Sequence, residues 1–439
     1  MLAFVLVLLF LAPAMGPGVA HAGTGSEYGN ITVGKYQLGE GLRFSTHRGH
    51  ELRLFTYIQP FVEAKQYTEH PEFGGPITRF RMRRLRMRLM GTSADDRVEF
   101  RLQFDLTGAN EVDTVDNTFL LDAFVTYRIT RYLELTFGQR ATPTDNRELF
   151  MLSHTLQLPE RSRLTSSFAA IREVGFFLNH RVRFGQSQHY LKPYLTLTNG
   201  DGPNVFGPDR GGFKVGGRLD YLPFGLFSRF GQFRQADLVR EPTPRLVVGG
   251  IASRNYGMSS RRGRESGGIL YLDADGEESL PTYTKVGVDF LFKWRGFSML
   301  GEYNRTFASV PGDIAFRVRN DGSQTDDFDG DIEGYVRGRM MLGRGYNLQA
   351  GYALPTNTSV DFRWTRLEAD EDSFLNNGTF YNRQTYVTGG LSQYYQGNYG
   401  LKVQGSLTWV DALPGSNDIY SEPIPGDEWI ARVITTLAL

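Results

Sequence analysis

The sequence predicts an all-β fold, a transmembrane antiparallel β-barrel of sixteen strands, with eighteen as the alternative count. Three observations predict it. Polar and apolar residues alternate in many short windows, as they do in a strand with one face toward lipid. After its first residues the chain has no apolar run of about 18 residues, which a membrane-spanning helix requires. Short and long connections also alternate between the expected strands, as they do at the two ends of an outer-membrane barrel.

The alternation is clearest between residues 98 and 106. The odd-numbered residues from Glu99 to Asp105 are polar, and the even-numbered residues from Val98 to Leu106 are apolar. A period of two indicates a strand, because a helix repeats about every 3.6 residues. Similar windows predict strands over residues 51–66, 78–91, 96–107, 118–128, 132–140, 171–183, 187–199, 210–222, 243–256, 281–294, 297–309, 345–354, 358–367, 383–396, 399–411 and 428–439.

Two connections depart from the pattern. The link over residues 224–243 falls where a short turn is expected and is long. The stretch over residues 331–342 could be a further strand, which would change the strand count. The long connection over residues 141–170 leads out of the fifth strand, and we name it the third loop.

The first residues have the layout of a cleavable secretory signal. Met1 to Ala12 are uncharged and nearly all apolar, Pro13 interrupts the run, and Ala20-His21-Ala22 fits an A-x-A cleavage site. A membrane anchor is the alternative, but it needs about 20 apolar residues. We therefore expect a signal peptide over residues 1–22, an N-terminal periplasmic segment over 23–50 and the barrel over 51–439.

The composition narrows the function classes. The chain has no cysteine, which excludes disulfides and thiol catalysis. Its 48 basic and 48 acidic residues balance, so the net charge indicates no nucleic-acid partner. Only seven of the basic residues are lysine and 41 are arginine. Arginine stays charged at any accessible pH and binds carboxylate or phosphate through two parallel donors.

Arginines are densest in the second expected strand. Arg84, Arg86 and Arg88 alternate with apolar residues and share one face, with a spacing of roughly 7 Å between neighbours. An arginine facing lipid near mid-membrane would cost about 2–4 kcal/mol, so this face is expected to line the lumen. Arg79, Arg81 and Arg83 have the opposite phase, which predicts a bulge near Arg83 and Arg84. Further pore-lining arginines are expected at Arg101, Arg128 and Arg140.

These arginines have two readings. A ladder of cations can pass an anion from one site to the next along the pore wall. The same side chains could instead pair with lumen carboxylates and brace the wall; candidates are Glu99, Asp105, Asp122 and Glu134.

The third loop carries Arg147, Arg161 and Arg163 among many apolar residues. A loop of this length is usually functional or disordered, and its apolar content argues against disorder. We expect it to fold into the lumen as a constriction that brings Arg161 or Arg163 opposite the ladder. The alternative is a loop packed on the outer rim.

Signatures of enzymes are missing from the sequence. It contains no Walker A loop, no H-E-x-x-H and no G-x-S-x-G motif, and its histidines lack metal-ligand spacing. We expect no catalytic residues, no cofactor and no metal site. The acidic residues 326–331 fit a calcium loop poorly and are expected in a solvated outer loop.

The chain resembles the phosphate-selective porin O and P family. The resemblance rests on Arg84-Leu85-Arg86-Met87-Arg88 before Gly91, Phe137-Gly138-Gln139, Pro159-Glu160-Arg161-Ser162, Asn199-Gly200-Asp201-Gly202 and the tail from Arg432 to Leu439. It implies sixteen strands, a homotrimer in the outer membrane, a third loop inside the lumen and wall arginines that conduct anions. The chain departs from the family in its few lysines and in ending on Leu439 rather than phenylalanine.

The resulting hypothesis is a porin of the bacterial outer membrane. It would contact lipid and lipopolysaccharide and form a passive diffusion channel for small hydrophilic solutes, with a preference for anions such as phosphate. The alternatives are a barrel enzyme and a plugged structural or interaction barrel.

Overall fold

A computed structural model describes residues 27–28, 31–67, 75–107, 120–186, 188–203, 210–263, 267–376, 383–413, 415–417 and 426–439. The predicted signal peptide lies outside the described residues. Within them, no helix is long and apolar enough to cross a membrane.

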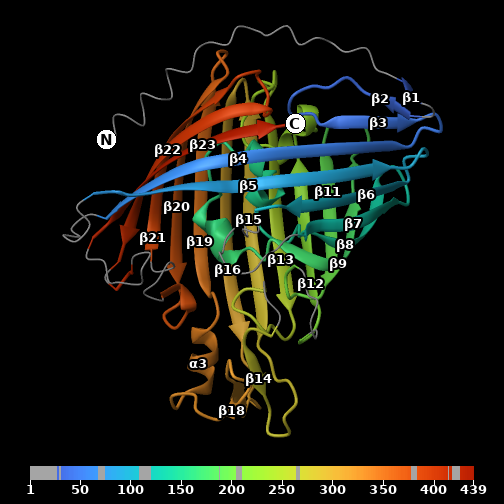
Figure 1. The fold of residues 1–439 in the computed structure, drawn as a ribbon. Helices are drawn as coiled ribbons and strands as arrows, with labels where there is room; N and C mark the ends of the chain where they lie inside the picture. The colour runs from blue at the N-terminus through green and yellow to red at the C-terminus, as the bar shows by residue number, and fades with distance from the viewer. Residues whose placement is uncertain are drawn as a thin grey trace.

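Sixteen antiparallel strands form one closed ring, as predicted (Figure 1). Each strand pairs with its neighbours in the ring, and the last strand, β23, pairs with the first, β4, over Glu428–Ala438 and Tyr57–Tyr67. Closure gives every ring strand a partner on each side, as a barrel in lipid requires because hydrocarbon offers no hydrogen bonds. The ring consists of β4 (Glu51–Tyr67), β5 (Ile77–Thr92), β6 (Val98–Asp105), β7 (Leu120–Arg128), β8 (Leu133–Ala141), β9 (Arg172–His180), β11 (Tyr190–Thr198), β12 (Lys214–Leu222), β13 (Arg245–Asn255), β15 (Thr282–Trp294), β16 (Phe297–Ser309), β19 (Gly343–Ala353), β20 (Thr358–Ala369), β21 (Arg383–Tyr394), β22 (Leu401–Ala412) and β23 (Glu428–Ala438).

Shorter elements complete the fold. Before the barrel, β2 and β3 form a hairpin whose second strand continues the sheet beside the start of β4. At the opposite end of the barrel, α3, β14 and β18 project beyond the strands (Figure 1). The shorter elements are β1 (Glu27–Tyr28), β2 (Ile31–Val33), β3 (Leu42–Thr46), β10 (Val182–Arg183), β14 (Leu270–Leu272), β17 (Phe316–Val318), β18 (Gln324–Thr325), η1 (Arg147–Phe150), η2 (Ser153–Thr155), α2 (Arg163–Phe168), η3 (Ser228–Phe233), α3 (Ile332–Gly338) and η4 (Phe374–Asn376).

One predicted irregularity is confirmed and one expectation is corrected. Gln59 pairs with Arg84 while Pro60 pairs with Met82, so Arg83 is the extra residue of a bulge, as the change of phase predicted. The stretch over residues 331–342 holds helix α3 instead of a strand. The side chain of Asp331 accepts a hydrogen bond from the Gly334 amide at 3.0 Å and caps the helix.

The two faces of the ring differ in chemistry. Outward-facing Val288, Val360 and Phe362 are at least half exposed. The alternate residues, such as Asp289 and Asp361, face inward and are buried. This arrangement is the reverse of a soluble protein and suits an apolar solvent around the barrel.

The outward apolar face gives a test of the lipid-facing register. Val288→Arg is expected to lower the free energy of unfolding in lipid vesicles by about 2–4 kcal/mol, because the guanidinium would enter hydrocarbon. Val288→Leu serves as the matched control and should leave the stability close to that of the parent. Urea titration of vesicle-embedded protein measures both variants, and an equal stability of the two would contradict the register.

Candidate functional site

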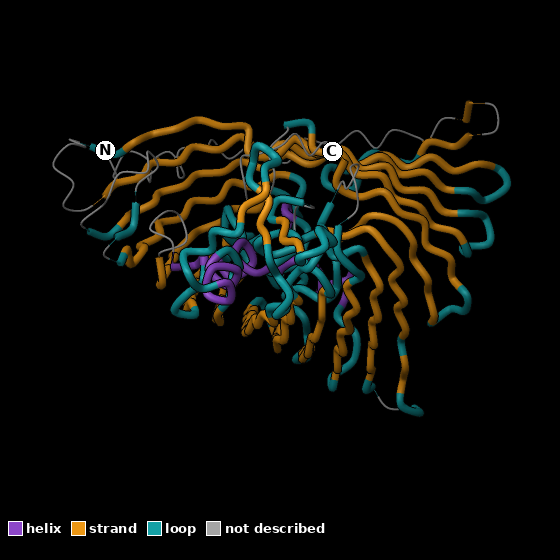
Figure 2. Tube along the Cα trace, turned by 90° about the horizontal axis from the view of Figure 1, so that it is seen from below, coloured by secondary structure: helices purple, strands orange, loops and turns teal. Residues whose placement is uncertain are grey.

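The third loop of the structure, residues 142–171 between β8 and β9, contacts strands from several parts of the ring. Arg147 bonds Asp220 of β12 and Asp289 of β15, both at 2.7 Å. The Gln157 amide group bonds Ser298 of β16 at 2.8 Å. The backbone carbonyl of Leu156 accepts a hydrogen bond from Lys402 of β22 at 2.6 Å. These contacts therefore run across the interior of the ring; seen from below, loops and short helices lie in the middle of the view (Figure 2).

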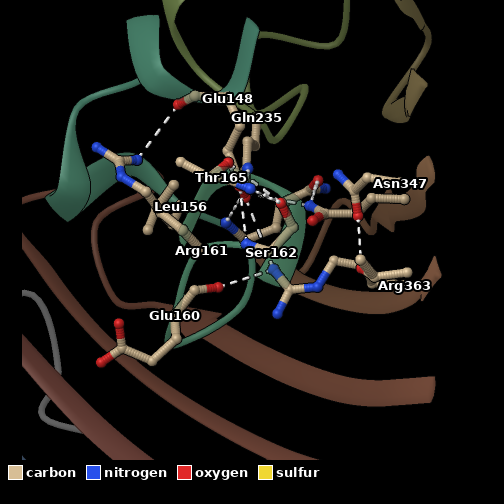
Figure 3. A network of polar contacts seen from close by, with 12 residues as sticks. Glu148, Leu156, Glu160, Arg161, Ser162, Thr165, Gln235, Asn347 and Arg363 are labelled. Carbon is tan, nitrogen blue, oxygen red and sulfur yellow. Dashed lines mark hydrogen bonds and ion pairs between the residues drawn. The ribbon is translucent and has the colours of Figure 1, made fainter. Parts of the chain in front are cut away.

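Glu148 organises the loop internally. Its side chain is fully buried and accepts hydrogen bonds from the amide and hydroxyl of Ser162, both at 2.8 Å, and from the Thr165 hydroxyl at 2.6 Å (Figure 3). Ser162 also caps helix α2 by accepting a hydrogen bond from the Thr165 amide. Arg161 donates to the backbone carbonyl of Glu148 at 3.2 Å. The loop is thus held by its own polar groups as well as by the wall.

Glu160 ties the loop to the arginine-rich strand β5. It forms ion pairs with Arg83 and, at 2.8 Å, with Arg84. Burial alone would raise the pKa of Glu160, but the two guanidinium groups outweigh burial and hold this pKa well below its ordinary value. The carboxylate therefore stays charged across the physiological pH range.

The predicted ladder residues share the lumen face of β5, and all three are buried, with exposed fractions of 1% for Arg84, 2% for Arg86 and 7% for Arg88. Arg84 binds Gln59 at 3.0 Å in addition to Glu160. Arg86 binds Asp105 at 2.7 Å and Ser153 of the third loop at 3.0 Å. Arg84 and Arg86 therefore make the contacts of the alternative in which the arginines pair with other groups and brace the wall.

Arg88 differs from the other two rungs. Its Nε donates to Gln103 at 2.6 Å, and within the described ranges it has no carboxylate within 4.0 Å. Arg101 of β6 lies within electrostatic range of both Arg88 and Arg140 of β8. Arg101 and Arg140 each place the guanidinium carbon 5.2 Å from the ring centre of Phe124. We name Arg88, Arg101 and Arg140 the cationic cluster.

Few negative charges balance the cationic cluster. The carboxylate of Glu99 is 4.0 Å from Arg101 and is bound more closely, at 3.2 Å, by Arg128. Asp122, the buried carboxylate between these strands, is bound at 2.8 Å by Arg172. Arg140 forms no ion pair with any described residue. The cluster thus carries more positive than negative charge.

The remaining predicted residues take other roles. Burial opposes the charge of Arg147, yet Asp220 and Asp289 raise its pKa above the ordinary value and fix it as a brace. Arg161 binds the carbonyls of Glu148 and Met151, and Arg163 donates to the hydroxyl of Tyr386 at 3.3 Å. Neither loop arginine therefore belongs to the cationic cluster.

Two features of the lumen escaped the sequence analysis. Phe124, whose ring lies against Arg101 and Arg140, could not be identified from the sequence, because its role depends on contacts between strands. The unusual length of the link between β12 and β13 was visible in the sequence, but its composition did not predict where its side chains lie. In the described part of the chain, no group of three or more histidines and carboxylates is arranged to hold a metal ion.

Comparison with known proteins agrees with this geometry. Residues 67–191 match the phosphate-selective porin O and P family. The predicted resemblance is confirmed over this segment, which contains the cationic cluster and the whole third loop. Together with the closed barrel, the match supports a porin-type channel and a location in the bacterial outer membrane, as predicted.

Solved structures of outer-membrane proteins match most of the chain at low sequence identity and with TM-scores below 0.5. OmpT of Vibrio cholerae in its trimer form is 8% identical, with 89% of this chain and 100% of that chain covered and a TM-score of 0.48. The channel DcaP of Acinetobacter baumannii is 11% identical, with 90% and 99% covered and a TM-score of 0.47. Among curated proteins, none matches the sequence.

The Glu160 ion pairs give a test of how the third loop is held. Glu160→Gln leaves Arg83 and Arg84 without this carboxylate, so hydrogen-exchange protection of residues 153–168 is expected to fall while that of β15 stays the same. In the parent, the ionised carboxylate stabilises the loop fully above the ordinary pKa of 4.5. That contribution is lost as the pH falls from there through the lower pKa of the folded state.

Protection of the parent loop should therefore be constant from pH 7 to about pH 5 and decline only below the ordinary glutamate range. Loop protection in Glu160→Gln that equals the parent at pH 7 would show that these ion pairs do not hold the loop.

Proposed function

We propose that the protein is a passive diffusion channel for small hydrophilic solutes that prefers anions, with phosphate or related oxyanions as the favoured class. The cationic cluster carries the proposal. Arg84, Arg86 and Arg147 each bind a carboxylate, so their fields are largely cancelled for a passing solute. Arg88 and Arg140 have no such partner among the described residues.

The chemistry of the cluster fits oxyanions. A guanidinium presents parallel donors that match two oxygens of a carboxylate or phosphate. The Nε of Arg101 is buried and has no hydrogen-bond acceptor in the described chain. The aromatic platform of Phe124 holds Arg101 and Arg140 without neutralising them. An anion can therefore bind here without displacing a protein carboxylate.

The third loop completes this proposal as the constriction. Its contacts with β12, β15, β16 and β22 support a position that narrows the passage, and His154 of the loop lies within electrostatic range of Arg88 of the cluster. We further propose that residues 1–22 are a cleaved signal, that residues 23–50 are periplasmic, and that lipopolysaccharide surrounds the outer rim. A channel of this kind needs no catalytic residue.

A plugged barrel without transport is the second candidate function. The observation that favours it is the number of loop side chains buried inside the ring, among them Arg147, Met151 and Leu156. Conductance separates the two candidates, because a plugged barrel inserted in a bilayer passes no current.

Substitution of the cluster tests the anion preference. Reversal potentials in asymmetric potassium chloride are expected to indicate anion selectivity in the parent. Replacing Arg88, Arg101 and Arg140 together by glutamine should reduce this selectivity several-fold, because uncompensated charges close to the path dominate the local field. Phosphate added to chloride solutions should reduce the chloride current of the parent more than that of the variant.

Arg97→Gln is the matched control, since Arg97 lies in an exposed turn with 63% of its side chain accessible. Cation selectivity of the parent, or an unchanged reversal potential in the triple variant, would refute the anion preference and leave the porin-type channel in place.

We also propose a homotrimer whose contacts use the side of the barrel with short strands. The six ring strands β6, β7, β8, β9, β11 and β12 have eight or nine residues, whereas β15 and β16 have 13. At about 3.3 Å per residue and a tilt of roughly 45°, nine residues span only about 21 Å, less than an apolar band of about 25 Å. The outward rings of Phe137 and Phe176 contact each other on this side, at 4.6 Å between centres. A second copy would cover this face better than lipid.

The double variant Phe137→Ala with Phe176→Ala is expected to release monomers in mild detergent, as measured by native mass spectrometry. The control variant Phe362→Ala with Val360→Ala lies on β20, across the ring, and should keep the parent assembly. A parent that is monomeric in detergent and in nanodiscs would refute the homotrimer.

A further inference from the structure

The connection between β12 and β13, residues 223–244, is long at the end of the barrel where turns are short, and we name it the inner link. The turn between β15 and β16 at the same end has only two residues, Arg295 and Gly296. Loops this long inside a compact fold usually serve a function. The inner link therefore needs an explanation that barrel closure does not supply.

The inner link is fixed to the wall at several points. Lys293 of β15 donates hydrogen bonds to the backbone carbonyls of Gly231 and Ala236, both at 2.9 Å. The hydroxyl of Tyr399, in the turn between β21 and β22, donates to the same Ala236 carbonyl at 3.2 Å. Asp237 accepts a hydrogen bond from the Gly296 amide at 2.7 Å. Because β15 and the β21–β22 turn are separated around the ring, the inner link extends across the opening at this end.

Gln235 joins the inner link to the third loop. Its side chain is 2% exposed, donates to the Glu148 carboxylate at 3.0 Å and accepts from the backbone N–H of Gln157 at 2.7 Å (Figure 3). It also accepts from the side chain of Gln349 on β19 at 3.2 Å. One buried amide group thus contacts two points of a loop that enters from the opposite end of the barrel.

Apolar contacts extend the same junction. Phe227 of the inner link lies in one buried cluster with Met151 and Leu156 of the third loop. The rings of Phe233 and Phe150 lie 6.2 Å apart. The two segments therefore pack together through both polar and apolar groups. A displacement of one segment would disturb the contacts of the other.

The inner link also brings a positive charge into the barrel. Arg234 places its guanidinium carbon 5.5 Å from the ring centre of Tyr399. Within the described ranges it forms no ion pair with a carboxylate. It lies within electrostatic range of His154, as Arg88 does, so both cations act on the same region of the lumen. Burial and these neighbouring cations hold the pKa of His154 well below its ordinary value.

We infer that the inner link is the second half of the constriction: solutes that cross the barrel pass beside the surface that it forms together with the third loop, and Arg234 contributes to the selection of anions there. This inference rests on the proposed channel function. Gln235 is a positioning residue in this scheme, because it holds the two segments together without contacting the solute. Arg234 is the residue that faces the passing anion.

Single-channel recording in planar bilayers tests the inference with three variants. In the first, a two-residue turn replaces residues 226–242; its conductance is expected to be at least roughly twice that of the parent, because one wall of the narrowest passage is gone. Gln235→Ala should increase the open-channel current noise, because it frees the third loop from the inner link. Arg234→Gln should move the reversal potential toward lower anion selectivity while the barrel stays folded.

The controls come from the same end of the barrel. Arg229→Gln removes an equal charge from an exposed position of the inner link, and Gln186→Ala removes an exposed amide from a neighbouring turn. Both are expected to conduct like the parent. Heat-modifiable migration in gels verifies that each barrel is folded, and if the shortened variant does not fold, Gln235→Ala and Arg234→Gln decide the question.

The outcomes separate this inference from the proposed function. A parent that is silent, together with a shortened variant that conducts, would support the inner link as a barrier and refute the open channel. A conducting parent whose conductance, noise and selectivity are unaffected by all folded variants would overturn the inference and leave the channel function standing.

Discussion

The absence of hydrogen-bond partners in hydrocarbon is the constraint on which this structure depends. Every backbone group at membrane depth must bond within the protein, and the pairing of β23 with β4 meets this demand by closing the ring. The same solvent makes apolar side chains stable on the outside, so the polar side chains gather inside. The lumen then becomes the place where charged groups must be satisfied, and its chemistry follows from how they pair.

Loop segments satisfy many of these inward charges. Arg147 reaches two wall aspartates that lie 73 and 142 residues away in the chain, and Glu160 reaches Arg84 across 76 residues. Each pairing compensates a charge at a buried site, where an unpaired ion would be costly. Charge compensation therefore shapes the interior together with apolar packing. The cationic cluster is the exception, since Arg88 and Arg140 remain without a described carboxylate partner.

The sequence predicts the barrel well and the lumen less well, for a physical reason. A strand's period of two fixes which face a residue takes, so the strands, the lumen side of Arg84 and the bulge at Arg83 could all be predicted. The period does not say which residue lies opposite across the barrel, and the partners of Arg84 and Arg86 decide whether they carry an open charge. The stretch over residues 331–342 could have been predicted as a helix, because Ile332, Tyr335 and Val336 follow helical spacing after a capping Asp331. The inner link shows the same limit, since its length was visible but its contact with Glu148 was not.

Gln235 and Glu148 belong to the part of the fold that would determine permeability, whereas the ring of strands determines stability. The ring of strands is held by backbone ladders that do not involve either side chain. In the proposed channel, the third loop and the inner link bound the passage and meet at the buried side-chain amide of Gln235. Substitutions at this junction can therefore change the passage without opening the ladder, because the free energy that closes the ring resides in bonds between strands. Width and selectivity can then vary among barrels of equal strand number through their loops alone.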